Sequence, residues 1–214
     1  MKQIPIKNIA LLKRLDYLAQ SLYRYPHTWE GLPKQDLSYS TLRSYQTDDD
    51  FVGYPKEHNY RDYSGLNRER LATVNGADFN SMKTWFMQLF RGGIDGAKSP
   101  EWYYDTLTVM APDKGFTGWH NSKNKPRHSL RFIHNNGRGY SVAVRNKVVT
   151  KVPDQWGIRR GAGDWTCVRN DFDGETWFAD KNQGSKPRFV VDVSIPRHLG
   201  EKADAVEEII KQFA

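Results

Sequence analysis

Apolar residues recur at every third or fourth position in two N-terminal stretches, which predicts two amphipathic helices. The first stretch runs from residue 7 to 23, and Pro26 is expected to end it. The second runs from about residue 79 to 91, after a candidate N-cap at Asp78. Its apolar stripe comprises Met82, Trp85, Phe86, Leu89 and Phe90. A stripe this rich in aromatic residues is expected to pack on the outside of a sheet.

The intervening segment, 25–77, is polar, rich in Tyr, Asp, Pro and Gly, and without sustained periodicity. A loop of this length in a compact domain is typical of a lid, a binding loop or a partner-dependent arm. Its acidic run at 48–50 is better explained as a solvated surface than as a cation site.

From about residue 101 the pattern changes to strand-forming residues with a period of two. Residues 145–147 are expected to form the turn of a hairpin, and 201–213 a closing helix. Expected strands cover 102–110, 130–134, 140–144, 148–152, 165–169, 175–180 and 189–195. We therefore predict a single α+β domain over 1–214, with helical support in 1–100, a curled β-sandwich or barrel core in 101–196, and a closing helix in 200–213.

The composition favours a reducing compartment. The single cysteine, Cys167, cannot form an intramolecular disulfide, and in its expected strand it is typical of a small buried apolar side chain. No stretch approaches the roughly 18 apolar residues of a membrane span, and the first residues lack the apolar run of a signal peptide. We expect a soluble protein in a cytoplasm, or in a particle assembled there, with no membrane partner. Nucleophile-elbow and phosphate-loop motifs are absent from the sequence.

Positive charge concentrates in the tract 114–160, which carries eleven basic residues against one acid, Asp154. The tract has a net charge of +10 and the whole chain +7, so the remainder sums to −3. A field of one sign attracts phosphates, which makes nucleic acid or another polyanion a candidate partner. A solvated sheet face explains the same charges equally well. The predicted anion-binding residues are Lys123, Lys125, Arg127, Arg131, Arg138, Arg145 and Lys147.

The motif Gly118–Trp119–His120 opens the β-rich tract, and the stretches 175–180 and 187–193 close it. This arrangement resembles the double-stranded β-helix proteins of the iron(II)/2-oxoglutarate-dependent oxygenase superfamily, in particular small phage-encoded members. The resemblance covers roughly residues 105–196. It implies a jelly-roll, cupin-like core.

The same resemblance implies roles for two residues. His120 corresponds to the first iron ligand, and Arg188 to the arginine that clamps the 2-oxoglutarate carboxylate. The metal triad is incomplete, because Ser122 stands where the family has an acid. Trp177 and Phe178 stand where its second histidine is expected.

Two further histidines could contribute to a metal site. On a strand, His128 and His134 face the same way but lie roughly 20 Å apart, so only one of them could join His120. A third ligand would then have to come from Asp171, Asp173, Glu175 or Asp180. Histidines that lie on the surface or form hydrogen bonds are the alternative.

Two functions follow. The resemblance implies an oxygenase-like phage protein that uses iron(II) and 2-oxoglutarate to hydroxylate an anionic substrate, such as a nucleic acid or nucleotide, in a host cytoplasm. The alternative is a catalytically inactive basic binding module, or a virion-associated structural module with a phage-protein partner, that keeps the same fold. The incomplete triad favours the module, and His120 with Arg188 favours the enzyme.

Overall fold

The computed structural model describes residues 1–24, 68–70, 84–85, 88–89, 104–110, 116–120, 127–134, 139–146, 148–153, 165–182, 184, 186 and 188–213. The helices are α1 (Ile9–Arg24), the short 3-10 helix η4 (Arg197–Leu199) and α6 (Gly200–Lys211). The strands are β1 (Lys2–Ile4), β2 (Arg68–Arg70), β3 (Tyr104–Met110), β4 (Phe116–His120), β5 (Arg127–His134), β6 (Gly139–Arg145), β7 (Val148–Pro153), β8 (Trp165–Phe172), β9 (Trp177–Asn182) and β10 (Arg188–Pro196).

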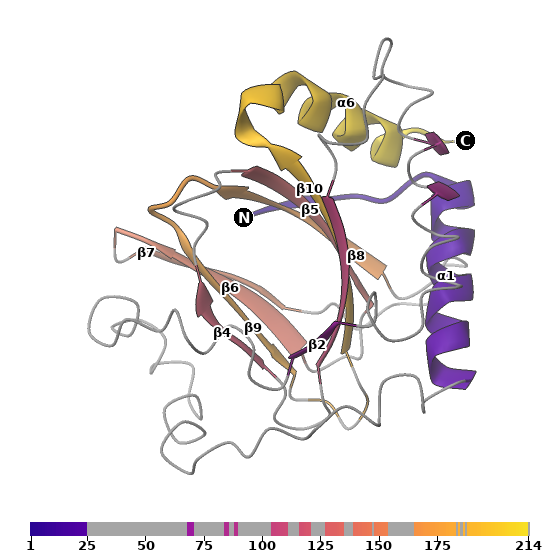
Figure 1. Cartoon of the computed structure of the whole chain (residues 1–214), viewed down its shortest axis with the longest axis horizontal. Helices are drawn as coiled ribbons and strands as arrows, with labels where there is room; N and C mark the ends of the chain where they lie inside the picture. Colours follow the sequence, from indigo (N-terminus) through magenta and orange to yellow (C-terminus); the bar gives the residue numbers. More distant parts are fainter. Residues whose placement is uncertain are drawn as a thin grey trace.

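The strands form two antiparallel sheets that face one another (Figure 1). The larger sheet has the order β1-β8-β5-β10-β3-β2, and the smaller has the order β4-β9-β6-β7. Side chains from both sheets meet between them, as the tilted rings of Phe172 and Phe178 do with centroids 4.3 Å apart. The space between the sheets is therefore a protein interior.

The pairing of the strands defines the fold. Counting from β3, the first strand pairs with the eighth (β3 with β10), the second with the seventh (β4 with β9), the third with the sixth (β5 with β8) and the fourth with the fifth (β6 with β7). This nested pairing, divided between two sheets, is the strand order of a jelly roll, or double-stranded β-helix. Strands β1 and β2 extend the larger sheet at its two edges.

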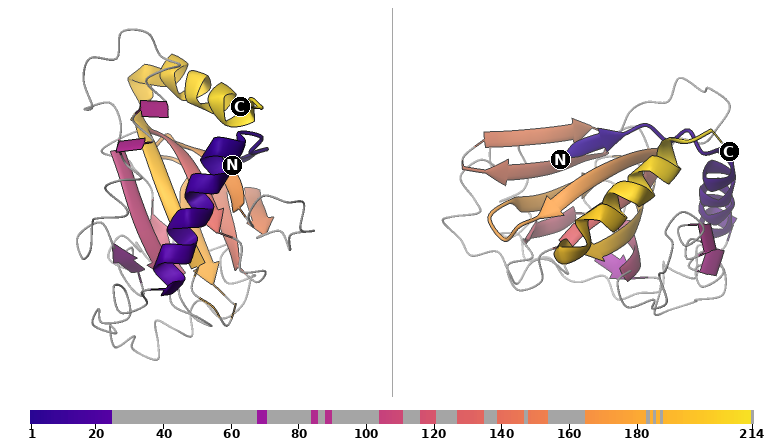
Figure 2. Two further views of the ribbon diagram at one scale, coloured as in Figure 1. Left: turned by 90° about the vertical axis from the view of Figure 1, so that its right-hand side faces the viewer. Right: turned by 90° about the horizontal axis from the view of Figure 1, so that it is seen from above.

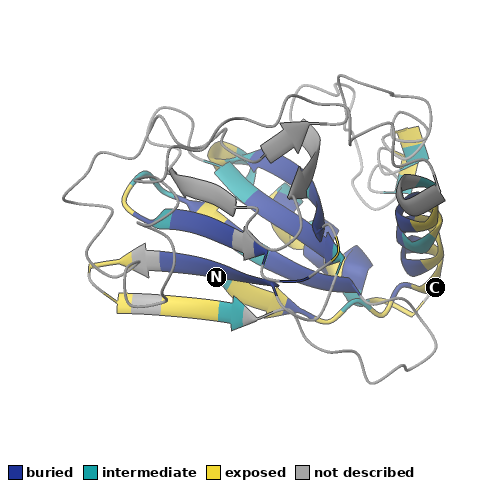
Figure 3. Cartoon of the chain, turned by 90° about the horizontal axis from the view of Figure 1, so that it is seen from below, coloured by how far each residue is buried: buried dark blue, intermediate teal, exposed yellow. Residues whose placement is uncertain are grey.

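The outer face of the larger sheet packs against both helices (Figure 2). Its apolar side chains alternate along β5, β8 and β10 with side chains that point between the sheets, which is the period-two pattern of a strand. The shared cluster includes Leu130, Phe132, Cys167, Val191 and Val193 from the strands, Leu11, Leu15 and Leu18 from α1, and Ala203, Val206 and Ile210 from α6. Burial is concentrated in the strands and in the inward stripe of α1 (Figure 3).

Asn8 joins the two helices end to end. Its Oδ1 accepts a hydrogen bond from the Leu11 amide at 2.9 Å, which caps the start of α1. Its Nδ2 donates to the carbonyl of Ile209 in α6 at 3.3 Å. The backbone amides of Lys7 and Asn8 donate to the Ile210 carbonyl. The first turn of α1 is thereby fixed to the last turn of α6.

The elements predicted from periodicity agree with the structure where it describes them. The helix expected over 7–23 is α1, and the turn expected at 145–147 contains Asn146 with φ 49°, a left-handed conformation that asparagine tolerates. Trp85 and Leu89, from the second expected helix, pack against the outer cluster, and Phe86 and Phe90 lie outside the described residues.

Three edge strands, β1, β2 and β4, were not among the expected strands. No element was expected over residues 2–4, where β1 lies, and β2 lies within the segment 25–77 that was expected to be a loop. Strand β4 carries the Gly118–Trp119–His120 motif, which was expected to open the β-rich tract but was not assigned to a strand. Strands β1 and β2 have three residues each, which is too short for an alternation of apolar and polar residues to be recognised. The remainder of 25–77 lies outside the described residues.

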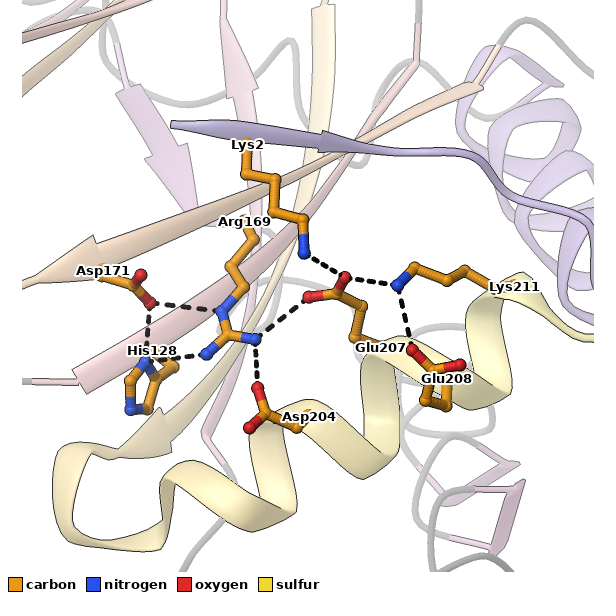
Figure 4. A network of polar contacts seen from close by, with 8 residues as sticks. All are labelled: Lys2, His128, Arg169, Asp171, Asp204, Glu207, Glu208 and Lys211. Carbon is orange, nitrogen blue, oxygen red and sulfur yellow. Dashed lines mark hydrogen bonds and ion pairs between the residues drawn. The ribbon is translucent and has the colours of Figure 1, made fainter.

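A network of charged side chains ties β1, β8 and α6 together on the outer surface (Figure 4). Glu207 of α6 accepts hydrogen bonds from Lys2 at 2.6 Å and from Arg169 at 3.0 Å, and pairs with Lys211 at 2.6 Å. Arg169 also binds Asp204 at 2.6 Å. Burial alone would raise the pKa of Glu207, but the hydrogen bonds from Lys2, Lys211 and Arg169 outweigh it and lower the pKa to about 2.

We expect Glu207→Gln to lower the free energy of unfolding by about 1.5–3 kcal/mol at neutral pH, because charge-assisted hydrogen bonds from three cations are weakened. The folded pKa of Glu207 is about 2, below its ordinary value of 4.5, so its contribution is complete above pH 4.5 and disappears as pH falls through 2. Urea unfolding of both proteins across this range measures the difference. The neighbouring Glu208→Gln is the control, because Glu208 is 63% exposed and, within the described ranges, pairs only with Lys211. Equal losses in the two variants would contradict the assignment.

Candidate functional site between the sheets

The face of the larger sheet that looks toward the smaller one carries polar side chains at its centre. Cross-strand neighbours form a row of Asn170, Ser129 and Ser194, and beside it a second row that contains Arg131 and Asp192. Ser129 and Asn170 have no exposed surface, and Arg131 is 5% exposed. An interior of this polarity needs internal hydrogen-bond partners.

Asp180 of β9 is the centre of the interior network. Its two carboxylate oxygens receive a bidentate pair of hydrogen bonds from Arg131 of β5, at 2.9 Å and 2.7 Å. Ser141 of β6 donates to the same carboxylate at 2.5 Å. Arg131 donates through Nε to Asp192 at 3.1 Å, and Ser129 donates to the other oxygen of Asp192. The pair Arg131–Asp180 therefore joins the two sheets across the interior.

Arg188, at the start of β10, completes this network. Its side chain has no exposed surface, its Nη1 lies 3.4 Å from Asp180 Oδ1, and its Nη2 donates to the Ser141 hydroxyl at 3.1 Å. Two guanidinium groups thus face two carboxylates, those of Asp180 and Asp192. The formal charges balance.

The electrostatics of the network follow from its burial. Desolvation alone would raise the pKa of Asp180, but the charges of Arg131 and Arg188 and the hydrogen bonds from Arg131 and Ser141 hold it far below its usual range. Desolvation would lower the pKa of Arg131, and the charges of Asp180 and Asp192 raise it instead. Both partners are therefore ionised at neutral pH.

The structure tests whether the residues implied by the family resemblance fit iron(II) and 2-oxoglutarate. The β4–β9 register sets His120 opposite Phe178, the position where a second histidine is expected. Phe178 is 1% exposed and packs against Phe172 and Ala143, so this position presents hydrocarbon and no metal ligand. The side chain of His120 lies outside the described residues.

Arg188, the residue implied to clamp the carboxylate, does not fit 2-oxoglutarate either. Arg188 is already neutralised by a carboxylate of the protein, and binding 2-oxoglutarate would require that ion pair to be replaced. Within the described part of the chain, no group of three or more His, Cys, Asp and Glu side chains is placed to hold a metal ion. The residues present do not fit the iron(II)/2-oxoglutarate pair.

The other candidate histidines lie on the outer face of the larger sheet. His128 Nδ1 is 2.6 Å from Asp171, in the surface network with Arg169 (Figure 4). His134 stands edge-on to the ring of Trp165, with centroids 5.0 Å apart. Asp180, in contrast, points between the sheets. The structure therefore separates these histidines from the interior carboxylates by the thickness of a sheet.

Four residues of the basic tract have described side chains. Arg131 is buried and binds two carboxylates of the protein, so we leave it out of any surface for external anions. The guanidinium of Arg127 lies 4.8 Å from the centroid of the Phe172 ring. Arg145 pairs with Asp173 and Glu175 at 3.0 Å and 2.9 Å. Lys151 is exposed and lies over the Tyr140 ring. The side chains of Lys123, Lys125, Arg138 and Lys147 lie outside the described residues.

Cys167 is fully buried in the outer cluster, as the sequence predicted, and burial raises the pKa of its thiol far above the usual range. A thiol in this state is not a nucleophile. None of the helices in the described part of the chain is long and apolar enough to cross a membrane.

Sequence reasoning identified Arg188 and Arg131 but assigned both to external anions, and it missed Asp180 as their partner. The sequence nevertheless contains a signal that Asp180 is a buried ion-pair partner. Asp180 lies in an expected strand at an alternating position with Phe178, so it shares a face with a large apolar residue. A charged residue on an apolar face requires an opposite charge, and the arginines of β5 and β10 were the candidates.

Comparison with known proteins finds similarity in structure alone, and it is distant. No family model and no curated protein matches the sequence. Solved structures with some similarity include vicilin from Corylus avellana (hazelnut), with a TM-score of 0.34 and 13% identity over 49% of this chain and 26% of that one. An oxidoreductase of the 2OG-Fe(II) oxygenase family from Burkholderia pseudomallei has a TM-score of 0.35 and 13% identity over 45% of this chain and 44% of that one. A cupin domain from Bordetella pertussis Tohama I has a TM-score of 0.30 and 13% identity over 44% of this chain and 80% of that one.

The first two similarities span about a quarter of the vicilin and less than half of the oxidoreductase. TM-scores of this size carry no argument about function. The fold assignment rests on the strand pairings described above.

Asp180→Asn is expected to lower the free energy of unfolding by about 3–5 kcal/mol, because it leaves two buried guanidinium groups facing a single carboxylate. Equilibrium unfolding in guanidinium chloride, followed by tryptophan fluorescence, measures this loss. Asp171→Asn is the matched control: Asp171 is 62% exposed, and about 1 kcal/mol or less is expected. A small effect of Asp180→Asn would show that the interior network does not hold the sheets together.

Proposed function

We propose that this protein is a double-stranded β-helix binding module that works without a catalytic metal and contacts polyanions through its basic tract. The observation that carries the first part is the state of Arg188. The side chain implied to clamp 2-oxoglutarate is fully buried and paired with Asp180, inside a network whose charges already balance. Such a network stabilises the fold, and its two described guanidinium groups are already matched by two carboxylates of the protein.

The polyanion part of the proposal rests on charge. The tract 114–160 holds eleven basic residues against one acid. Removing Arg131, which is bound internally, and Arg145, which pairs with Asp173 and Glu175, leaves nine basic residues. A surplus of this size over one segment favours association with phosphates through counterion release. Nucleic acid is therefore the proposed partner class, bound without base recognition.

An oxygenase-like enzyme is the competing function, and its support is positional. The register of β4 and β9 brings His120 opposite the position of the family's second histidine, and Arg188 opens β10. A hydroxylating enzyme of this type would need both residues free to bind iron(II) and 2-oxoglutarate. A phage or virion role would suit either function and rests on the sequence resemblance alone.

The metal question has a direct test. Under anaerobic conditions, titration calorimetry of the protein with iron(II) and 2-oxoglutarate is expected to show no saturable binding, because position 178 offers hydrocarbon and Arg188 is occupied. His120→Ala should behave as the unaltered protein does. Saturable binding of iron(II) that His120→Ala abolishes would overturn the metal-independent function and restore the enzyme.

The salt dependence of oligonucleotide affinity tests whether the protein binds polyanions. Binding of unrelated single-stranded oligonucleotides is expected to weaken with salt, with a log–log slope near −3 for about four contacts at roughly −0.7 each. The double variant Lys123→Ala/Lys125→Ala should weaken binding to all sequences alike, because phosphate contacts position the strand without reading bases. Fluorescence anisotropy at several salt concentrations provides the measurement.

The matched control is Lys13→Ala/Lys202→Ala, which removes the same charge from the two helices outside the tract. It should change affinity much less. Equal weakening by both variants would point to net charge instead of a site, and absence of binding at low salt would leave the tract as a solubilising surface.

A further inference from the structure

An unpaired amide lies in the interior, apart from the ion network. Asn170 of β8 has no exposed surface, and neither its Oδ1 nor its Nδ2 has a hydrogen-bond partner among the residues that the structure describes. Leaving one buried polar atom unpaired costs about 1–3 kcal/mol, and here both ends of one amide are unpaired. Asn182 of β9, a buried asparagine in the smaller sheet, donates to the Lys186 carbonyl and accepts from the Gly184 amide. The unpaired state of Asn170 therefore calls for an explanation.

The surroundings of Asn170 are small and polar across the sheet. Ser129 is its cross-strand neighbour on β5, and Ser194 lies opposite Ser129 on β10. Ser129 donates its hydroxyl hydrogen to Asp192. The Asp192 side chain is 15% exposed although it points between the sheets, so solvent reaches the interior beside this row.

Along the strand, the surroundings of Asn170 are apolar. Val168 precedes it on the same face and belongs to a cluster with Ile133 and Val190, and Phe172 follows it and packs against Phe178. Met1 packs against both clusters. Thioether side chains adapt their shape readily, so Met1 is the most adaptable of the apolar side chains packed around Asn170.

We infer that Asn170 is the recognition residue of an interior site for a small planar molecule with an amide-like edge. A carboxamide offers one acceptor and one adjacent donor, so a cyclic amide, such as the edge of a pyrimidine base, satisfies both atoms with one pair of hydrogen bonds. The apolar groups before and after Asn170 suit the two faces of a flat ring. The hydroxyls of Ser129 and Ser194 supply the remaining polar contacts. This site is separate from the basic tract and does not depend on polyanion binding.

Uracil is the probe, and 1,3-dimethyluracil is its matched control, because methylation removes both N–H donors while keeping the ring. Titration calorimetry of the whole protein is expected to show saturable binding of uracil and at least tenfold weaker binding of the dimethyl compound. Asn170→Leu, which keeps the approximate size of the side chain, should weaken uracil binding at least tenfold. The affinity of the Asn170→Leu variant for oligonucleotides should stay unchanged.

A second measurement covers the case in which Asn170→Leu does not fold. In 15N-labelled protein, the side-chain NH2 resonance of Asn170 is expected to shift on uracil addition, whereas that of Asn182, whose partners are internal, should stay fixed. No saturable uracil binding, as when water alone completes the hydrogen bonds of the amide, overturns the inference. Equal binding by Asn170→Leu, or a shift that spares Asn170, also overturns it.

Discussion

The pairing of Arg131 with Asp180 is the interaction on which the arrangement of the two sheets depends. Other contacts in the described interior join it, since Asp180 also accepts a hydrogen bond from Ser141 and pairs with Arg188, while Arg131 also donates to Asp192. Desolvating these charges is costly, and only the complete set of partners offsets that cost. The network therefore specifies one register of the sheets: a shift of one residue in either sheet would turn Asp180 or Arg131 away from its partner.

The same network explains why the fold could be predicted from the sequence more completely than the site could. Helix α1, the hairpin of β6 and β7, and strand β10 each have a local signal, either a period or a turn residue. The site depends on pairs far apart in sequence, such as Arg131 with Asp180, whose separation of 49 residues has no local signature. Charge counting alone placed Arg131 on the surface, because a sequence does not show which face of a strand meets another sheet.

His120 shows that a clear local motif can also mislead about the site. Its motif resembled that of a family with a metal site, and the strand order agrees with the fold implied. The chemistry depends on what stands across from it, and Phe178 in the opposing register is an aromatic core residue. A motif in one strand thus defined a position in the fold, while the residues of the neighbouring strand decided what that position can bind.

The order of strands also bears on how the chain can be made. Strand β10 lies in the middle of the larger sheet, between β5 and β3, although it is the last strand in the sequence. During synthesis, β3 and β5 emerge well before the strand that joins them, so both have an unpaired edge until residue 196 has left the ribosome. Contacts between such distant segments form slowly, and exposed edges recruit other chains. A nascent chain of this protein should therefore depend on chaperones until its final strand arrives, and truncation before β10 should yield aggregates in place of a smaller domain.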